Sequence, residues 1–412
     1  MKLKHILLLS VLVLLSIFVS AQENEDKPKK GELYLTPLPI LGANPTVGVI
    51  FGVAASAGYY FGEPETTRMS TAMSTVNYST KDQLLSFIKT NIFLPNDKWV
   101  LQGDLRYFDS SQPTFGLGTG PQSAKLATGG NIEYDDNLFS APIDQKQQLV
   151  FKFFRFHQNA LIEMKDNYYL GAGYNLDYFY NIKDNLLDLD TTSGNIPTIT
   201  SHLVYSYAHN ISTEKYTTSG VSLVALFDSR DNSMTPYKGR FLNLEFFINP
   251  TLLGSEKNST RLWLEYRDYF SVSKKHKQNL IAIWMFGNFV TSGTLPYLNL
   301  PATGWDKFGR SGRAYTQGRF RGENLIYNEA EYRMRLFGTK KNPNLFGAVA
   351  FVNATTASSE LSNIKLYDYL DFGYGIGLRF MINKKSRINV TIDYAWGEYG
   401  ASGFFLNATE TF

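Results

Sequence analysis

The chain repeats a hydrophobic pattern with a period of two along much of its length. Apolar residues alternate with charged, polar or small residues in five segments: 99–107, 168–178, 261–267, 371–382 and 386–397. In 371–382 the polar positions include Gly373, Gly375 and Gly377, a glycine content that disfavours helix. These segments are 7 to 12 residues long, and the longer ones match a tilted strand that crosses a bilayer.

Helical membrane spans are excluded beyond the first 21 residues. The longest apolar stretch there, 280–290, is interrupted by Gly287 and Asn288 and is too short to span as a helix. A secreted β-sandwich is the alternative, but its strands are shorter and turn their apolar face inward. Repeated Asp, Glu and Arg on the polar face, with Tyr and Trp at strand ends, favour an all-β transmembrane antiparallel β-barrel.

The spacing of turns predicts the topology of this barrel. Short turns at 94–98 and 381–386 alternate with long polar connections at 111–145, 183–215 and 292–327. We expect the short turns in the periplasm and the long connections outside. The chain length favours sixteen strands, with fourteen as the alternative. The first strand is predicted near 47–61, and the last near 403–412, closing on Phe412.

The N-terminus predicts export. Lys2 and Lys4 precede an apolar run over 6–19, and the small residues Ser20 and Ala21 fit a cleavage site. A secretory signal peptide over 1–21 is favoured over a membrane anchor, because the run is short. We expect a polar periplasmic leader over 22–44 and a barrel domain over 45–412, located in the bacterial outer membrane.

Composition narrows the function. The chain has no cysteine, which excludes disulfides, thiolate metal sites and a cysteine nucleophile. Charged residues make up 19% and hydrophobic residues 43%, which fits neither a disordered chain nor a helical membrane protein. Loss of Lys2 and Lys4 with the signal takes the basic residues from 40 to 38 against 37 acidic ones, so nucleic-acid binding has no electrostatic support.

Catalytic chemistry finds little support. The five histidines form no metal-binding pair at helical spacing, and no nucleophile elbow or phosphate-binding loop occurs. His202 and His209 lie near Ser201 and Ser206, which leaves an enzyme at the barrel rim as a minor alternative. We therefore predict no enzyme activity, no cofactor and no metal.

Several stretches go beyond a generic barrel pattern. Asp228-Ser229-Arg230-Asp231-Asn232 followed by Pro236-Tyr237-Lys238-Gly239 resembles the strand-turn-strand signature of the bacterial surface antigen barrel of the BamA/TamA superfamily. The positions of that turn signature are Asp228, Arg230, Asp231, Pro236 and Gly239. Residues 373–380 and 388–395 resemble the penultimate hairpin of this barrel, and 45–61 resembles its first strand.

Residues 312–322 resemble the tip of the long extracellular loop that folds into the lumen in this superfamily. The matching positions are Arg313, Ala314, Tyr315, Gly318, Arg319, Arg321 and Gly322. The resemblance implies that a loop arginine docks on acids of the next two strands, where Glu331 and Asn353 stand. Asn353 replaces an expected aspartate. Arg313 is favoured as the docking arginine, although Ala314 replaces the glycine that follows it, and Arg321 is the alternative.

The physics of docking is independent of the resemblance. A long loop loses conformational entropy unless it is pinned, and an arginine fork facing a carboxylate in a partly desolvated lumen is a strong bond. We expect Arg313, Arg319 and Arg321 to face Glu329, Glu331 and Asp393. The alternative is that these are solvated lumen charges.

The resemblance also implies a function. The 22–44 segment is far too short for the periplasmic POTRA repeats of the superfamily, so the chain is predicted to be a short member without them. The first hypothesis is an assembly factor whose weakly paired seam assists insertion or translocation of proteins. The second is a passive pore or a structural subunit of a larger complex. Expected partners are outer-membrane lipids, unfolded outer-membrane proteins and other envelope subunits, with no nucleic acid.

Overall fold

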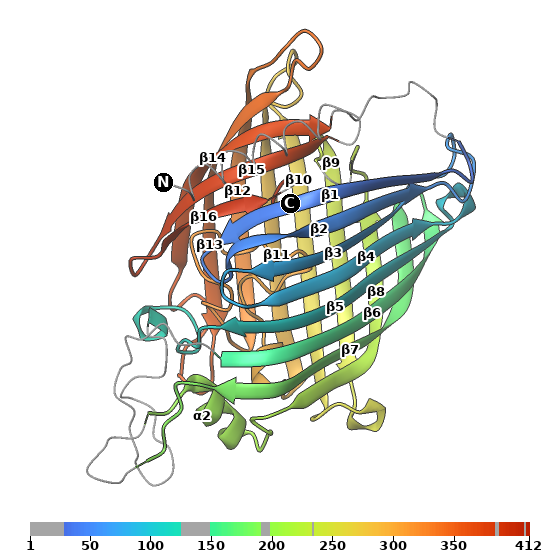
Figure 1. Ribbon diagram of the computed structural model, residues 1–412. Helices are drawn as coiled ribbons and strands as arrows, with labels where there is room; N and C mark the ends of the chain where they lie inside the picture. Colours follow the sequence, from blue (N-terminus) through green and yellow to red (C-terminus); the bar gives the residue numbers. More distant parts are fainter. Residues whose placement is uncertain (1–28, 125–148, 191–197, 233–234, 384–386, 408) are drawn as a thin grey trace.

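The protein is a closed antiparallel barrel with its strands in chain order (Figure 1). The computed structural model describes residues 29–124, 149–190, 198–232, 235–383, 387–407 and 409–412. Within these residues, the sixteen strands are β1 (Leu33–Asn44), β2 (Gly48–Tyr59), β3 (Ser70–Ser79), β4 (Leu84–Phe93), β5 (Trp99–Gln112), β6 (Leu149–Lys165), β7 (Tyr168–Asp184), β8 (Tyr216–Asp228), β9 (Gly239–Asn249), β10 (Ser259–Ser271), β11 (Leu280–Gly293), β12 (Asn324–Phe337), β13 (Phe346–Ser358), β14 (Asp371–Asn383), β15 (Ile388–Gly397) and β16 (Ser402–Asn407).

Within the described residues, helical structure is confined to the connections between strands. The helix α2 (Ser201–Ala208) lies between β7 and β8, and Thr200 caps it by accepting a 3.2 Å hydrogen bond from the Leu203 amide. Short 3₁₀ turns occur at η1 (Pro95–Asp97), η2 (Pro121–Ala124), η4 (Thr251–Leu253) and η5 (Tyr297–Asn299). In the described part of the chain, no helix has the length and hydropathy needed to cross a membrane.

The alternation in the sequence separates the two faces of the wall. On β14, Tyr374, Ile376 and Leu378 point outward and are 57%, 60% and 59% exposed, whereas Gly375 and Arg379 on the same strand are buried. Exposure of large apolar side chains in a continuous band is stable only in contact with lipid. The predicted antiparallel barrel of sixteen strands is therefore confirmed.

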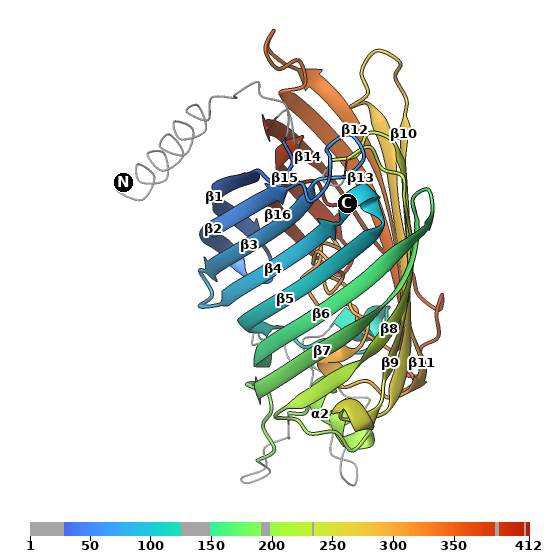
Figure 2. The same cartoon turned by 90° about the vertical axis from the view of Figure 1, so that its right-hand side faces the viewer.

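The connections divide between the two ends of the barrel. The long segments 113–148, 185–215 and 294–323 each follow an odd-numbered strand and therefore share one end. The turn at 94–98 and the end of β14 lie at the other end, together with the start of β1. β16 is short, and its end lies opposite Ala43 near the end of β1. This is the grouping expected from the sequence. Figure 2 shows β1 and β16 beside each other in the wall.

The predicted position of the first strand is wrong, because one more strand precedes it. Residues 33–44, expected in the leader, form β1, and the strand expected at 47–61 is β2. Pro37 and Pro39 obscured β1 because proline disfavours a central strand, yet Leu33, Leu35 and Leu41 keep the alternation and are exposed. The barrel therefore starts before residue 45. The predicted signal peptide, 1–21, lies outside the described residues.

The last strand is shorter than predicted. β16 has 6 residues, and the segment from Thr409 to Phe412 leaves the wall. Glu410, Thr411 and Phe412 are buried, at 3%, 4% and 4% exposure. The prediction that Phe412 closes the final strand is therefore corrected: Phe412 packs in the barrel interior.

Candidate functional site

The candidate site is formed by the inner loop, which we define as residues 294–323 between β11 and β12. Its base is anchored by an apolar cluster against β6 and β7, made of Leu295, Tyr297, Leu298 and Leu300 with Phe151, Phe153 and Phe179. Burial of these side chains supplies the hydrophobic free energy that holds the loop against the wall. The polar tip of the loop then reaches the inward faces of β12 to β15.

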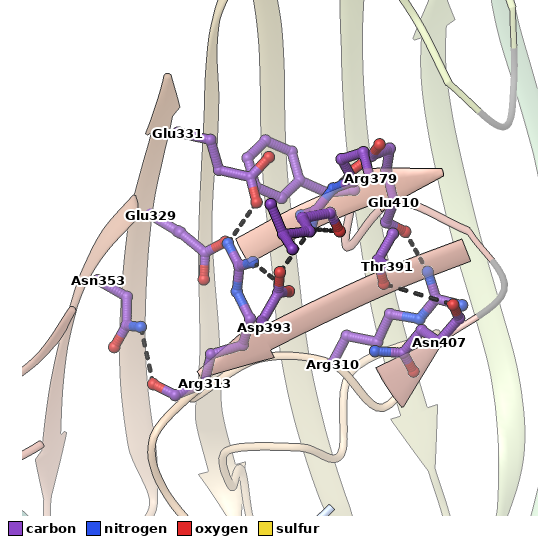
Figure 3. A network of polar contacts seen from close by, with 12 residues as sticks. Arg310, Arg313, Glu329, Glu331, Asn353, Arg379, Thr391, Asp393, Asn407 and Glu410 are labelled. Atoms are coloured by element: carbon purple, nitrogen blue, oxygen red, sulfur yellow. Dashed lines mark hydrogen bonds and ion pairs between the residues drawn. The ribbon is translucent and has the colours of Figure 1, made fainter. Parts of the chain in front are cut away.

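Arg313 is the centre of this contact (Figure 3). Its guanidinium forms ion pairs with Glu329 and Glu331 of β12, and with Asp393 of β15 at 2.9 Å. The same group lies 3.5 Å from the ring centroid of Phe351. All four partners and Arg313 itself are buried. Charge-assisted bonds in such an environment are strong, and loss of one partner would leave uncompensated buried charge.

Asn353 contributes in a different way from the expected one. Its Nδ2 donates a 3.0 Å hydrogen bond to the backbone carbonyl of Arg313 and so holds the main chain of the loop (Figure 3). The neighbouring Gly373 leaves room for this approach, since a Cβ atom there would lie 2.7 Å from the same carbonyl oxygen. Arg313 therefore keeps several acidic partners although Asn353 replaces an aspartate.

Ala314 distinguishes between the two possible registers of the loop motif. Its φ is +103°, a region that favours glycine and is strained for alanine. This is the position where the resembled family has glycine after its arginine. The ion pairs of Arg313 show that it is the arginine that faces the acids.

Tyr315 also holds the tip of the inner loop against the wall. Its hydroxyl donates to the Phe372 carbonyl and accepts a 2.9 Å hydrogen bond from the Glu398 amide. Its ring packs edge-on against Phe320 at 4.7 Å. Burial raises the pKa of the Tyr315 hydroxyl to about 12, so it remains a donor at neutral pH.

Arg319 and Arg321 do not face the acids that were expected for them. Arg319 donates to the carbonyl and the hydroxyl of Ser123, and Arg321 donates to the Tyr297 carbonyl at 2.8 Å. Burial lowers the pKa of Arg319 to about 10, which leaves it charged at neutral pH. Both arginines bind backbone oxygens and so hold the loop in shape.

Two glycines shape the same stretch of the loop. Gly318 adopts a φ of +77°, and its amide donates a 2.8 Å hydrogen bond to the Thr303 carbonyl. At Gly322, a Cβ atom would lie 1.8 Å from the carbonyl oxygen of Ser358, so only glycine lets the loop pass this close to β13.

A chain of ion pairs extends from Arg313 to the C-terminus (Figure 3). Asp393 also accepts a 2.5 Å bond from Arg379 on β14, and Arg379 pairs with Glu410 at 2.7 Å. Arg333 pairs with Glu331 at 2.6 Å. The sequence analysis assigned no docking role to Arg333, Arg379 or Glu410. Arg333 and Arg379 could have been found, because each lies at an inward-facing position of a strand whose residues alternate between apolar and polar.

The turn signature lies at the opposite end of the barrel from the base of the inner loop. Arg230 pairs with Asp228 at 2.8 Å, and Asp231 accepts a 2.9 Å hydrogen bond from the Tyr237 amide. Pro236 is buried in the turn, and Gly239 opens β9 with a φ of +102°. These contacts stabilise the turn and stay apart from Arg313.

The seam, which we define as the junction of β1 and β16, is weakly paired. Its register contains one position, Ala43 opposite Leu406, whereas β1 pairs with β2 along its whole length. Among the residues that the structure describes, no strand pairs with the seam side of β1 over residues 33–42. An unpaired edge is a template for another strand.

The residues considered for a rim enzyme are placed on or next to α2. The His209 Nδ1 lies 2.8 Å from the Tyr205 carbonyl, and the ring of His202 packs edge-on against Tyr297 at 5.3 Å. Among the residues the structure describes, no three His, Asp or Glu side chains are grouped to hold a metal ion.

Comparisons with known proteins place the chain in a family and show its fold. The Omp85 superfamily domain matches residues 60–412. BamA from Haemophilus ducreyi, in a structure lacking POTRA domains 1–3, is 13% identical, with a TM-score of 0.55 over 93% of this chain and 71% of that chain. CdiB from Acinetobacter baumannii is 12% identical, with a TM-score of 0.47 over 92% of this chain and 60% of that one. No curated protein matches the sequence.

Proposed function

Because the chain belongs to the Omp85 superfamily, we propose that it assists the insertion or translocation of proteins at the outer membrane. The fold supports an outer-membrane location, and in this proposal the long connections face outward and the start of β1 faces the periplasm. Unfolded outer-membrane proteins are the proposed clients. The proposal assigns no catalytic residue and no cofactor.

The observation that carries the proposal is the seam. β1 and β16 are joined at a single paired position, whereas every other neighbouring pair of strands shares an extended ladder. Opening such a junction breaks few hydrogen bonds, so a client strand or lipid has a low-cost passage between β1 and β16.

A passive pore or structural subunit is the second candidate, and one feature of β1 favours it. The amide and carbonyl groups of Val49 in β2 form hydrogen bonds with Thr80, on the side of β3. Backbone groups of even-numbered β2 residues therefore point the other way, toward β1. In the β1–β2 register these residues are opposite even-numbered residues of β1, so the even-numbered residues of the two strands bond each other. Odd-numbered residues of β1 therefore face the seam. Pro37 and Pro39 are among them, and each lacks an N–H for a client strand.

Liposomes containing the purified barrel test the proposal. We expect faster insertion of an unfolded outer-membrane protein than into empty liposomes. A disulfide between Ala43→Cys and Leu406→Cys should abolish the gain, because it locks the seam. The chain has no native cysteine to interfere. The matched control is a disulfide between Leu41→Cys and Phe51→Cys, which joins strands that are already fully paired.

Two results would contradict the proposal. Full activity of the locked barrel would exclude passage through the seam, and no acceleration by the unlocked barrel would favour the pore or subunit. For the pore, deletion of residues 311–323 should raise the conductance of planar bilayers, since these residues fill the interior. An unchanged conductance would show that the inner loop does not block a pore.

A further inference from the structure

A cavity lies in the lumen between the barrel wall and the base of the inner loop. Its wall side is formed by inward residues of β6 to β11, and its other side by loop residues between 295 and 305. The cavity has a volume of about 40 Å³, roughly three times the ~10–15 Å³ that one water molecule needs. It is therefore large enough for a small polyatomic ion.

The charges around this cavity do not balance. Arg155 on β6 donates to both oxygens of the Asp177 carboxylate on β7, at 2.7 Å each. The His157 Nε2 lies 3.0 Å from the same carboxylate, and Asn299 of the loop donates a long 3.5 Å hydrogen bond to it. Among the described residues, Asp177 is the one carboxylate that lines the cavity, and these groups already bind it.

Arg261 on β10 is a second cation of the cavity. Its guanidinium lies 4.0 Å from the ring centroid of Phe247, the residue opposite it on β9. Within the described part of the chain, no carboxylate forms an ion pair with Arg261. Contact with an aromatic ring does not use the N–H groups of a guanidinium, so they remain donors for an anion.

An adjoining cavity, which Arg261 also lines, does not supply the missing counter-charge. Its acids are bound to other groups: ion pairs join Asp104 to Arg106 and Glu265 to Arg267, and Glu245 accepts a 3.0 Å hydrogen bond from Asn159. Lys307 of the inner loop lines this cavity as well. The charge of Glu245 offsets that of Lys307, which leaves Arg261 uncompensated.

Several polar side chains of the first cavity lack hydrogen-bond partners within the described structure. The atoms concerned are both amide atoms of Asn175, the hydroxyl of Thr218, and the amide oxygens of Asn288 and Asn299. Asn175, Thr218 and Asn288 are buried, at 4%, 7% and 7% exposure. Buried polar groups are costly without partners, so this set points to an occupant that bonds them.

The polar groups of the cavity specify what the occupant must carry. Arg261, Asn175 and Thr218 offer N–H and O–H donors, which suit the oxygens of an anion. The amide oxygens of Asn288 and Asn299 only accept, so the ligand needs an O–H as well. Inorganic phosphate meets both needs because it keeps at least one proton at neutral pH, whereas sulfate and ionised phosphate esters lack the O–H.

We propose that this cavity is a binding site for inorganic phosphate, with Arg261, Asn175 and Thr218 holding its oxygens and Asn288 and Asn299 accepting from its O–H. The ion joins the wall at β7, β8, β10 and β11 to η5, and so fastens the base of the inner loop. Water is the competing occupant, but it leaves the charge of the partly buried Arg261 uncompensated. The inference goes beyond the proposed function and holds equally for an insertase, a pore or a structural barrel.

Calorimetric titration of the purified barrel in detergent with inorganic phosphate tests the inference. We expect saturable binding at one site, with sulfate and glycerol phosphate binding about tenfold more weakly or worse at neutral pH. Arg261→Gln should weaken phosphate binding by a similar factor. The matched control is Arg240→Gln on β9, whose side chain is 59% exposed, bonds Asp268 and lies outside both cavities, so that the affinity should not change.

Asn288→Ala tests the acceptor side of the site while Arg261 is kept. This substitution removes one acceptor for the ligand O–H and no donor to its oxygens. Phosphate binding should therefore weaken severalfold, while the weak binding of sulfate stays the same. The variant also decides the matter if Arg261→Gln does not fold, which the circular dichroism of the barrel would show.

Four results would overturn the inference. No saturable binding of phosphate would mean that the cavity holds water only. Equal affinities for phosphate and sulfate, or an unchanged preference in Asn288→Ala, would mean that no ligand O–H is recognised. Undiminished phosphate binding by folded Arg261→Gln would place the ion elsewhere on the barrel, as an adventitious ion only.

Discussion

The β12–β15 arc and the seam belong to the same wall but are held together in different ways. The arc has extended ladders between neighbouring strands and is bridged on its inner face by Arg313, which joins β12 to β15 through Glu329, Glu331 and Asp393. The seam has one paired position and edge prolines. Stability is thus concentrated where the inner loop docks, and the barrel is weakest where β1 meets β16.

The difference lies in what the inner faces of the strands carry. Inward positions of the arc carry charges that pair with Arg313 of the inner loop and, through Arg379, with Glu410. β16 ends at Asn407 and pairs with β1 at one position.

Removal of the Arg313 side chain is expected to have the largest effect on the stability of the barrel. Arg313→Ala leaves three buried carboxylates without their shared partner and should lower the free energy of unfolding by about 3–5 kcal/mol. Denaturant unfolding of the barrel in detergent measures the loss. Lys30→Ala, which breaks an exposed ion pair with Glu63 beside β1, is the control and should cost about 1 kcal/mol or less. Equal losses would contradict the asymmetry between arc and seam.

Asn353→Asp should have an intermediate effect on the free energy of unfolding. It tests how the β12–β15 arc holds the main chain of the inner loop. The substitution replaces the amide that donates to the Arg313 carbonyl with a carboxylate that faces the same oxygen. We expect a loss of about 1–3 kcal/mol in the unfolding free energy. Asn353→Ala, which removes the donor without adding charge, should lose less. A gain in stability for Asn353→Asp would instead mean that the carboxylate reaches the Arg313 guanidinium.

Ala314→Gly should have the smallest effect, and it should raise the free energy of unfolding where the other two substitutions lower it. Glycine adopts a φ of +103° without the steric cost that alanine incurs, so the docked loop should gain about 1 kcal/mol. The shift in unfolding midpoint measures this. Ala302→Gly in the same loop, at a position without a positive φ, is the matched control and should lose stability. A loss for Ala314→Gly would show that its backbone is not strained.

Much of the site was predictable from residues that alternate or resemble a motif. Arg313, Glu329, Glu331 and Asp393 were expected to face one another, and they do. Arg319 and Arg321 were expected to face the same acids, but Arg319 binds Ser123 of another connection and Arg321 binds the Tyr297 carbonyl of the inner loop itself. Charge type alone does not distinguish an arginine that meets a carboxylate from one that meets a carbonyl.

The sequence by itself determined that the chain forms a transmembrane barrel, because a period of two places apolar side chains on the lipid face whatever the neighbouring strands are. It also determined which charges point inward. Only the tertiary structure decided that Pro37 and Pro39 lie on a seam edge, that Asn353 holds a backbone carbonyl, and that Glu410 and Phe412 turn inside. These depend on which segments meet across the closed barrel, and that proximity arises from distant strand pairing and not from local pattern.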